Sequence, residues 1–234
     1  MESLSNFELG FSLSFMRRAT NCLQYLMVVI LAGCAAYRSA GLVQSGRRAL
    51  LTDDGEKALA YFRQAADINP DYFFEFGLFR EGIWTYVGRA EYQEGRLPEA
   101  RRSLERALKA EDNDYLAWLY LGLTLARGGE ESRALDKVKR GLEGLHDWLD
   151  YVNATDPFRA FWDPQREIRG EIKKALDMIA SEDVNWHDLI SKAEWVGRQM
   201  EEEIDWVRRD ERRHFRNRDH GIRSGASIGV GVGF

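Results

Sequence analysis

Cysteine, histidine and proline are the residues that this sequence has least of. Its 234 residues include two cysteines, four histidines and four prolines. Two cysteines cannot build a disulfide scaffold, and so few cysteines and histidines leave little material for a metal cluster. The scarcity of proline, beside abundant alanine, leucine, arginine and glutamate, favours helices over strands. The composition therefore predicts an all-α protein.

A surplus of positive charge is also missing. Lysine and arginine number 33 against 38 acidic residues, which gives a net charge of −5. Proteins that bind nucleic acid usually carry a basic surplus, so we expect no nucleic-acid partner. Hydrophobic residues make up 44% and charged residues 30% of the chain. These fractions argue against both a disordered polyelectrolyte and a polytopic membrane protein.

The common catalytic motifs are absent from the sequence as well. It contains no phosphate-binding Gly-x4-Gly-Lys loop, no His-Glu-x2-His zinc motif and no Gly-x-Ser-x-Gly elbow. None of the four histidines stands at ligand spacing with a carboxylate partner; they are His146, His187, His214 and His220. We therefore expect no enzymatic activity, no metal and no cofactor.

The first distinctive segment lies near the amino terminus. Met16-Arg17-Arg18 precedes an apolar run that extends from Tyr25 to a small-residue junction at Gly33. A positive cluster, a short apolar run and small residues are typical of a secretory signal. The run is shorter than the ~20 apolar residues that span a bilayer. We predict a signal peptide over residues 1–33, with Met16 as an alternative start; the competing interpretation is a buried core helix.

Leu31-Ala32-Gly33-Cys34, directly after the apolar run, resembles the bacterial lipoprotein box. The resemblance implies that cleavage precedes Cys34, that its thiol receives lipid, and that residues 34–38 form a lipidated linker. Cys22 would be removed with the signal. Several acyl chains together give a stable membrane anchor. Because Ala35 and Ala36 follow the cysteine, the resemblance also implies the outer membrane, with the protein facing the periplasm.

The middle of the chain repeats itself. Three copies align at offsets of 42 and 34 residues, so the first offset contains an eight-residue insertion, placed at residues 73–80. When the three copies are aligned, two positions hold a small residue in every copy and two others hold a large apolar residue. The small columns are Gly46, Gly88, Gly122 and Ala58, Ala100, Ala134; the large ones are Leu42, Trp84, Trp118 and Phe62, Leu104, Val138.

Each copy has the pattern of two helices joined by a short turn. In the second copy, Gly95 suits the end of one helix and Pro98 the first turn of the next. Gly128-Gly129 separates the two helices of the third copy in the same way. We expect the small residues where paired helices approach closely, and the large ones between neighbouring hairpins.

A 34-residue hairpin with Trp-x3-Gly on its first helix and Ala-x3-(Phe/Leu)-x2-Ala on its second resembles the tetratricopeptide repeat. Pro70 also matches the proline that ends the family's second helix. The resemblance covers residues 39–148 and implies a solenoid of about three repeats that binds proteins or peptides. Its first helices would line a concave groove at Val43, Arg47, Thr85, Arg89, Tyr92, Tyr120 and Arg127. Three arginines and two tyrosines suit an acidic or aromatic peptide, and the alternative is a merely solvated groove.

The insertion is rich in aromatic residues. Phe73, Phe76, Arg80 and Ile83 keep helical spacing, which predicts that the first helix of the second copy begins about two turns early. The phenylalanines would be extra core, or alternatively an exposed ridge for a partner.

The carboxyl-terminal third predicts a helical cap over residues 149–216. A loop over residues 149–163 would lead to a helix that Asp163 caps, that has Pro164 in its first turn, and that ends near Ile179. A longer helix follows, over about residues 183–214. Its inward side chains would be Leu189, Val196, Met200, Ile204 and Val207. The acidic triple 201–203 is expected on its surface, and the tryptophans at 186, 195 and 206 suggest a homodimer.

Residues 217–234 predict a glycine-rich flexible tail. Within it, residues 227–234 alternate apolar residues with glycine, which is a strand period on a weak backbone. A disordered tail and a strand that docks on a partner's sheet are both compatible with this pattern.

Two functions follow from these features. The first is a lipid-anchored scaffold that holds a protein or peptide partner in the bacterial cell envelope. The alternative is a permanent structural subunit of an envelope complex, with no separate peptide-binding groove.

Overall fold

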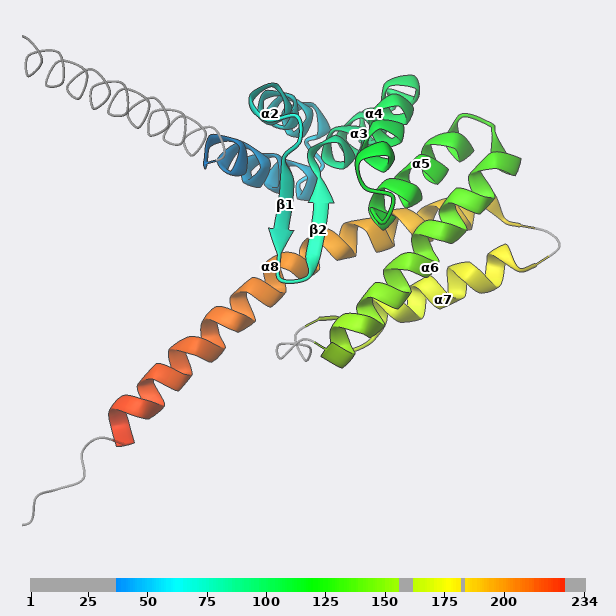
Figure 1. Cartoon of the computed structure of the whole chain (residues 1–234). Helices are drawn as coiled ribbons and strands as arrows, with labels where there is room; N and C mark the ends of the chain where they lie inside the picture. Colours follow the sequence, from blue (N-terminus) through cyan, green and yellow to red (C-terminus); the bar gives the residue numbers. More distant parts are fainter. Residues whose placement is uncertain (1–36, 156–161, 182–183, 226–234) are drawn as a thin grey trace, which may run out of the picture.

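The computed structural model describes residues 37–155, 162–181 and 184–225 (Figure 1). The predicted signal peptide, Cys34 and the alternating segment 227–234 lie outside the described residues. Three helical hairpins follow one another in the first described range. They pair the helix over residues 37–51 with α2 (Gly55–Ile68), α3 (Ile83–Gln93) with α4 (Leu97–Ala110), and α5 (Tyr115–Arg127) with α6 (Glu131–Thr155). Each packs against the next, so the fold is an all-α solenoid of helical hairpins.

Glycines allow the two helices of each hairpin to approach closely. A Cβ atom at Gly46 would lie 2.4 Å from the ring of Phe62, and one at Gly88 would lie 2.5 Å from Leu104. At Gly122 the added atom would lie 2.6 Å from both the side chain and the backbone nitrogen of Val138. Atoms cannot pack at these distances, so a larger residue would push the helices apart. The three hairpins thus have the same internal contact.

Two tryptophans join neighbouring hairpins at their ends. The indole Nε1 of Trp84 donates to the carbonyl of Pro70, and that of Trp118 donates to the carbonyl of Asp112, both at 2.8 Å. An arginine stacks on each ring, Arg106 on Trp84 and Arg140 on Trp118. Each tryptophan is therefore half-buried and links its helix to the loop before it. Neither is enclosed in the core between hairpins.

The insertion forms a β-hairpin, and the prediction of an early helix start there is wrong. β1 (Phe73–Phe76) pairs antiparallel with β2 (Phe79–Gly82) across a two-residue turn in which Gly77 has φ 55°. Helical spacing of the aromatic residues could not reveal this, because four-residue stretches fit either period. The deciding features are a glycine at the first turn position and the preference of aromatic residues for strands. α3 accordingly begins at Ile83.

α6 is longer than expected, because residues 149–155 continue it and do not form a loop. Leu145, Leu149 and Val152 extend its buried stripe, with exposed fractions of 3% or less. The side chain of Asn153 donates to the carbonyl of Leu149, one turn earlier. The apolar spacing of this stripe overrides the turn-forming residues that follow it.

α7 (Glu167–Ile179) ends where predicted but begins later than expected. Asp163 still caps it, because its carboxylate accepts hydrogen bonds from the backbone N–H groups of Ile168 at 3.0 Å and Arg169 at 3.2 Å. The chain makes an extra turn between the cap and the helix, where Arg166 takes a left-handed conformation with φ 60°. Pro164 therefore lies before the first helical turn.

α8 (Trp186–Gly225) is a single 40-residue helix that starts beside α7 and continues beyond the rest of the molecule (Figure 1). It begins three residues later than predicted and ends about eleven later, so residues 217–225 are helical and the tail prediction is wrong for them. The predicted inward side chains, Leu189, Val196, Met200, Ile204 and Val207, are all fully buried. Among the described residues, no helix is both long and apolar enough to cross a membrane.

Candidate protein-interaction site

The first helices of the three hairpins line one face of the array, and α8 lies across that face (Figure 1). We call this face the concave face; it comprises the helix over residues 37–51, α3 and α5. Polar side chains from each of these helices meet α8. Arg47, Arg89 and Arg127, one from each hairpin, all pair with carboxylates of α8.

A buried ion network fixes the centre of α8. Arg47 donates through Nε to the carboxylate of Glu201, while Nη1 of Arg89 lies 2.8 Å from the other oxygen of the same group. Nη1 of Arg89 also lies 2.7 Å from the carboxylate of Glu81, and its Nη2 donates to the carbonyl of Gly197 at 3.3 Å. The side chains of Arg47, Arg89, Glu81 and Glu201 are at most 4% exposed. Arg47 and Arg89 both pair with the carboxylate of Glu201, and buried charges are tolerated when they are paired in this way.

The two carboxylates in this network have opposite pKa shifts. Burial alone would raise the pKa of Glu201, but Arg47 and Arg89 together hold it below its ordinary value. Glu81 has Arg89 alone as its cationic partner, so burial outweighs that attraction and raises the pKa of Glu81 to about 8. Oε2 of Glu81 has no hydrogen-bond partner among the described residues. Glu81 therefore carries a proton at neutral pH, and Glu201 does not.

Close packing between α8 and α5 also holds α8 against the concave face. A Cβ atom on Gly197 of α8 would lie 2.6 Å from the hydroxyl oxygen of Tyr120 on α5. Tyr120 itself packs edge-on against Tyr92, with ring centroids 5.5 Å apart. The absence of a side chain at Gly197 thus lets α8 approach α5, and the approach brings Glu201 to the arginines.

One edge of the concave face stays accessible beside α8. There the hydroxyl of Tyr92 donates to Glu194, and Nη2 of Arg127 lies 2.5 Å from the same carboxylate. Arg198 bridges from α8 to Asp53 at 2.9 Å. Both Arg127 and Arg198 are about two-fifths exposed. Burial and the hydrogen bond to Glu194 raise the pKa of Tyr92 well above its ordinary value, so its hydroxyl stays protonated.

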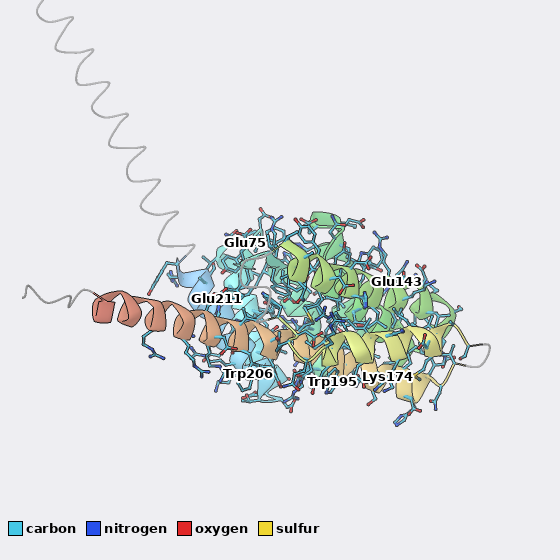
Figure 2. The ribbon with its side chains drawn as sticks, turned by 90° about the horizontal axis from the view of Figure 1, so that it is seen from below. Glu75, Glu143, Lys174, Trp195, Trp206 and Glu211 are labelled. Atoms are coloured by element: carbon cyan, nitrogen blue, oxygen red, sulfur yellow. The ribbon has the colours of Figure 1, made fainter. Side chains whose placement is uncertain are left out.

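A pocket of about 390 Å³ opens at this edge, between the concave face and α8. We call it the edge pocket. Its walls combine aromatic and apolar side chains with three arginines and three acidic residues, and the ion pairs described above use all six charged groups. The lining residues include Tyr92, Tyr120, Arg127, Glu194, Trp195 and Arg198. In Figure 2, Trp195 lies on α8 in the middle of the molecule, away from the projecting end. A pocket of this size and composition can take one or two side chains of a peptide.

The structure places the seven predicted groove residues on the same face but divides them into two groups. Arg89, Tyr92, Tyr120 and Arg127 line the edge pocket. Among these four only Arg127 is exposed, because Arg89, Tyr92 and Tyr120 are at most 9% exposed. The other three do not line the pocket and have exposed fractions of 1% or less: Val43, Arg47 and Thr85. Thr85 donates to Asp114, the N-cap of α5, at 2.5 Å.

The residues of α8 that complete the site were missed. The acidic triple was expected on the helix surface, but Glu201 is 1% exposed and pairs with two arginines. Glu194 and Gly197 precede it on the same side of the helix. The spacing of these three residues at i, i+3 and i+7 is a signal that they share one face. Sequence alone does not pair that face with arginines more than 100 residues away.

No group of three or more histidine, cysteine, aspartate or glutamate side chains is arranged to hold a metal ion, as far as the described residues extend. Asp112-Asn113-Asp114, one of the acidic clusters in the sequence, caps α5 and joins two repeats. The chemistry of the site is therefore that of ion pairs and aromatic contacts.

Comparison with known proteins identifies part of the array. The sequence profile of the family described as "Tetratricopeptide repeat" matches residues 88–144, from the middle of α3 into α6. No curated protein and no solved structure gives a significant match to the chain. The matched segment covers the second and third hairpins, and the first hairpin has the same glycine contact. The chain thus contains a tetratricopeptide repeat, a fold unit that generally mediates protein–protein interaction and is not itself catalytic.

Proposed function

We propose that the protein is a lipid-anchored tetratricopeptide scaffold of the bacterial cell envelope, which holds a protein or peptide partner at the edge pocket. The observation that carries the proposal is the pocket itself, because four of the seven residues expected to bind a partner line it. An acidic partner side chain could replace Glu194 on Arg127, and an aromatic one could pack against Tyr92 or Trp195. The proposal includes no enzymatic step, metal or cofactor.

The envelope location is proposed from the sequence. The apolar run and the lipoprotein box support lipid attachment at Cys34, and the residues after it support the outer membrane facing the periplasm. Cys34→Ala should give a protein that is uncleaved and lost from the outer-membrane fraction, whereas Cys22→Ala, the matched control, should leave fractionation unchanged. Recovery of unmodified wild-type Cys34 in the soluble fraction would contradict the anchor.

A second candidate is favoured by a specific observation. Because α8 fills the centre of the concave face with its own buried side chains, the groove in which such repeats receive a peptide is already occupied. The protein would then be a permanent structural subunit of an envelope complex, which contacts its neighbours through other surfaces. A homodimer formed through the exposed parts of α8 belongs to this second candidate.

Substitutions at the edge pocket distinguish the two candidates. Arg127→Glu reverses an accessible charge without entering the buried network, and Lys139→Glu makes the same charge change on the outer helix α6. Both residues are at least about two-fifths exposed. Partners captured from detergent-solubilised membranes should be lost at least tenfold with Arg127→Glu and kept with Lys139→Glu, when counted by quantitative mass spectrometry. Equal capture by both variants would reject the edge pocket and leave the permanent subunit.

A further inference from the structure

The end of α8 projects from the molecule and carries an excess of positive charge. Residues 208–225 contain seven arginines and three acidic residues, although the chain as a whole has a net charge of −5. Arg208 stacks on Phe74 and Phe76 of the β-hairpin, at the point where α8 passes this hairpin. Figure 1 shows that the helix continues beyond this point away from the other elements. Most of these arginines therefore belong to the part of the helix that extends beyond the other elements.

Four of these arginines lie on one face of the helix. Arg209, Arg212, Arg213 and Arg216 are all exposed, and their spacing of three and four residues places them on one side of α8. We call this set the arginine stripe. The contacts of Arg209, Arg212 and Arg213 stay within α8. Asp210 neutralises part of the charge on Arg213, at 3.7 Å. The remaining members leave a row of guanidinium groups in solvent.

An exposed tryptophan extends the stripe toward the body of the protein. Trp206 is 54% exposed, and the guanidinium of Arg209 stacks on its ring at 3.9 Å (Figure 2). A tryptophan beside several arginines is the combination that proteins place at the boundary between lipid headgroups and acyl chains.

The location of the stripe fits a membrane surface. Tyr37 and Arg38, the first described residues, follow Cys34 by three and four positions and are exposed. In both figures, this beginning and the projecting end of α8 lie toward the same end of the molecule. A membrane that held the lipid on Cys34 would therefore lie on the side where the arginine stripe projects.

We propose that the projecting end of α8 binds the surface of an anionic phospholipid membrane, with the arginine stripe at the headgroup phosphates and Trp206 at the interface. The proposal rests on the proposed function for the membrane location only. Guanidinium groups pair with phosphate oxygens in a bidentate manner, and several of them near an anionic leaflet bind additively. The contact would orient the repeat array relative to the bilayer in a way that one flexible lipid anchor cannot.

The test uses the full chain with Cys34→Ser, so that no attached lipid contributes to binding. Vesicles of phosphatidylcholine alone are compared with vesicles that contain about one-third phosphatidylglycerol. We expect the protein to bind the anionic vesicles at least tenfold more tightly and to lose that preference in about 0.5 M salt. The segment before Cys34 carries Arg17 and Arg18 and can itself favour anionic vesicles. Because it is present in every sample, a difference between the two variants below reports on α8 and not on this segment.

Two variants with equal net charge locate the binding surface. Changing Arg209, Arg212, Arg213 and Arg216 to glutamine preserves helix propensity and should remove most of the anionic preference. The matched control changes Arg102, Lys109, Arg133 and Lys139 to glutamine; these residues are exposed on α4 and α6. It should keep the preference. Both variants should show the wild-type thermal unfolding temperature.

Three outcomes would overturn the proposal. They are equal binding of the wild type to both vesicles, an equal loss in both variants, and tight binding to a polyglutamate peptide or duplex DNA without binding to vesicles. Because the attached lipid is absent from this test, none of these outcomes bears on the lipid anchor at Cys34. The anchor would fail separately, by fractionation of the wild-type protein.

Discussion

The repeat array and α8 bury apolar side chains alike, but they differ in how far apart in the sequence their contacting residues lie and in how many of the contacts are charged. In the array, the contacts that matter are apolar and close in sequence: each glycine of a first helix meets a side chain sixteen residues later on the second. α8 instead contacts all three hairpins through charged groups up to 154 residues apart, with Glu201 of α8 between Arg47 and Arg89. The comparison teaches that a local pattern builds the repeats, while contacts between residues far apart in the sequence, both the buried apolar stripe of α8 and its ion pairs, place α8 on their concave face.

Removal of Glu201 tests the long-range half of this comparison and should have the largest effect. Glu201→Ala would leave Arg47 and Arg89 buried with less compensation, which typically lowers the free energy of unfolding by ~3–5 kcal/mol. Glu202→Ala is the matched control, because its partner is the exposed Arg198 on the same helix. That change should cost at most about 1 kcal/mol. Equal denaturation midpoints for the two variants would contradict the buried network.

The pH dependence of stability tests the burial of Glu81 in the same network. The pKa of Glu81 is about 8 in the folded protein and close to 4.5 when unfolded, so the folded state holds a proton that the unfolded state releases between these values. The contribution of Glu81 is therefore fully present below pH ~4.5 and is lost as the pH rises toward about 8. The decline can reach roughly 1.4 kcal/mol per pH unit.

Glu81→Gln isolates this contribution, because glutamine can still accept from Arg89 and does not titrate. The variant should lose less stability than the wild type between pH 6 and pH 8, when urea unfolding is measured at both values. Parallel behaviour of the two proteins over that range would show that Glu81 is already ionised.

A glycine substitution tests the local half of the comparison. Gly122→Ala introduces an atom 2.6 Å from the backbone of Val138 and should lower the free energy of unfolding by ~1–3 kcal/mol. Gly170→Ala on α7 meets nothing within 4 Å and should be stabilising, by up to about 1 kcal/mol. Opposite signs of the two changes are expected in chemical denaturation. The same sign in both would mean that Gly122 does not lie at a close helix contact.

The smallest effect is expected at the edge pocket. Tyr92→Phe removes the hydroxyl that donates to Glu194, while Arg127 remains beside that carboxylate. A hydrogen bond to a charged group contributes about 1.5–3 kcal/mol, and the remaining contact of Arg127 with Glu194 should keep the loss at the lower end of that range. Tyr37→Phe, at a side chain that is 83% exposed, is the control and should leave stability unchanged. A loss no larger than that of the control would show that Tyr92 does not hold α8.

The repeats were predictable from sequence for a physical reason. A column of glycines opposite a column of large apolar residues can be satisfied only by two helices in contact, so Gly46, Gly88 and Gly122 define the hairpins without any structure. The same reasoning failed at residues 73–82, because four aromatic residues over so short a stretch fit a helix and a strand equally well. There Gly77 decides the outcome through its backbone conformation.

The candidate site was predictable only in part. Stepping along the first helices from the aligned glycines identified the residues of the concave face, including Arg89 and Tyr92. That α8 covers this face could not be found in this way, because acidic residues on a long helix usually lie in solvent. Glu201 is an exception that depends on arginines from two other hairpins, and no local pattern contains that information.

Hydrogen exchange along α8 tests the central claim most directly. If α8 is an integral part of the concave face, amides in residues 189–207 should exchange as slowly as those of α3 and α5, at the rate of global unfolding. Amides in residues 209–225, which project beyond the other elements, should exchange much faster. Exchange of residues 189–207 well before α3 and α5 would contradict the account, since α8 would then leave an open groove without unfolding of the array.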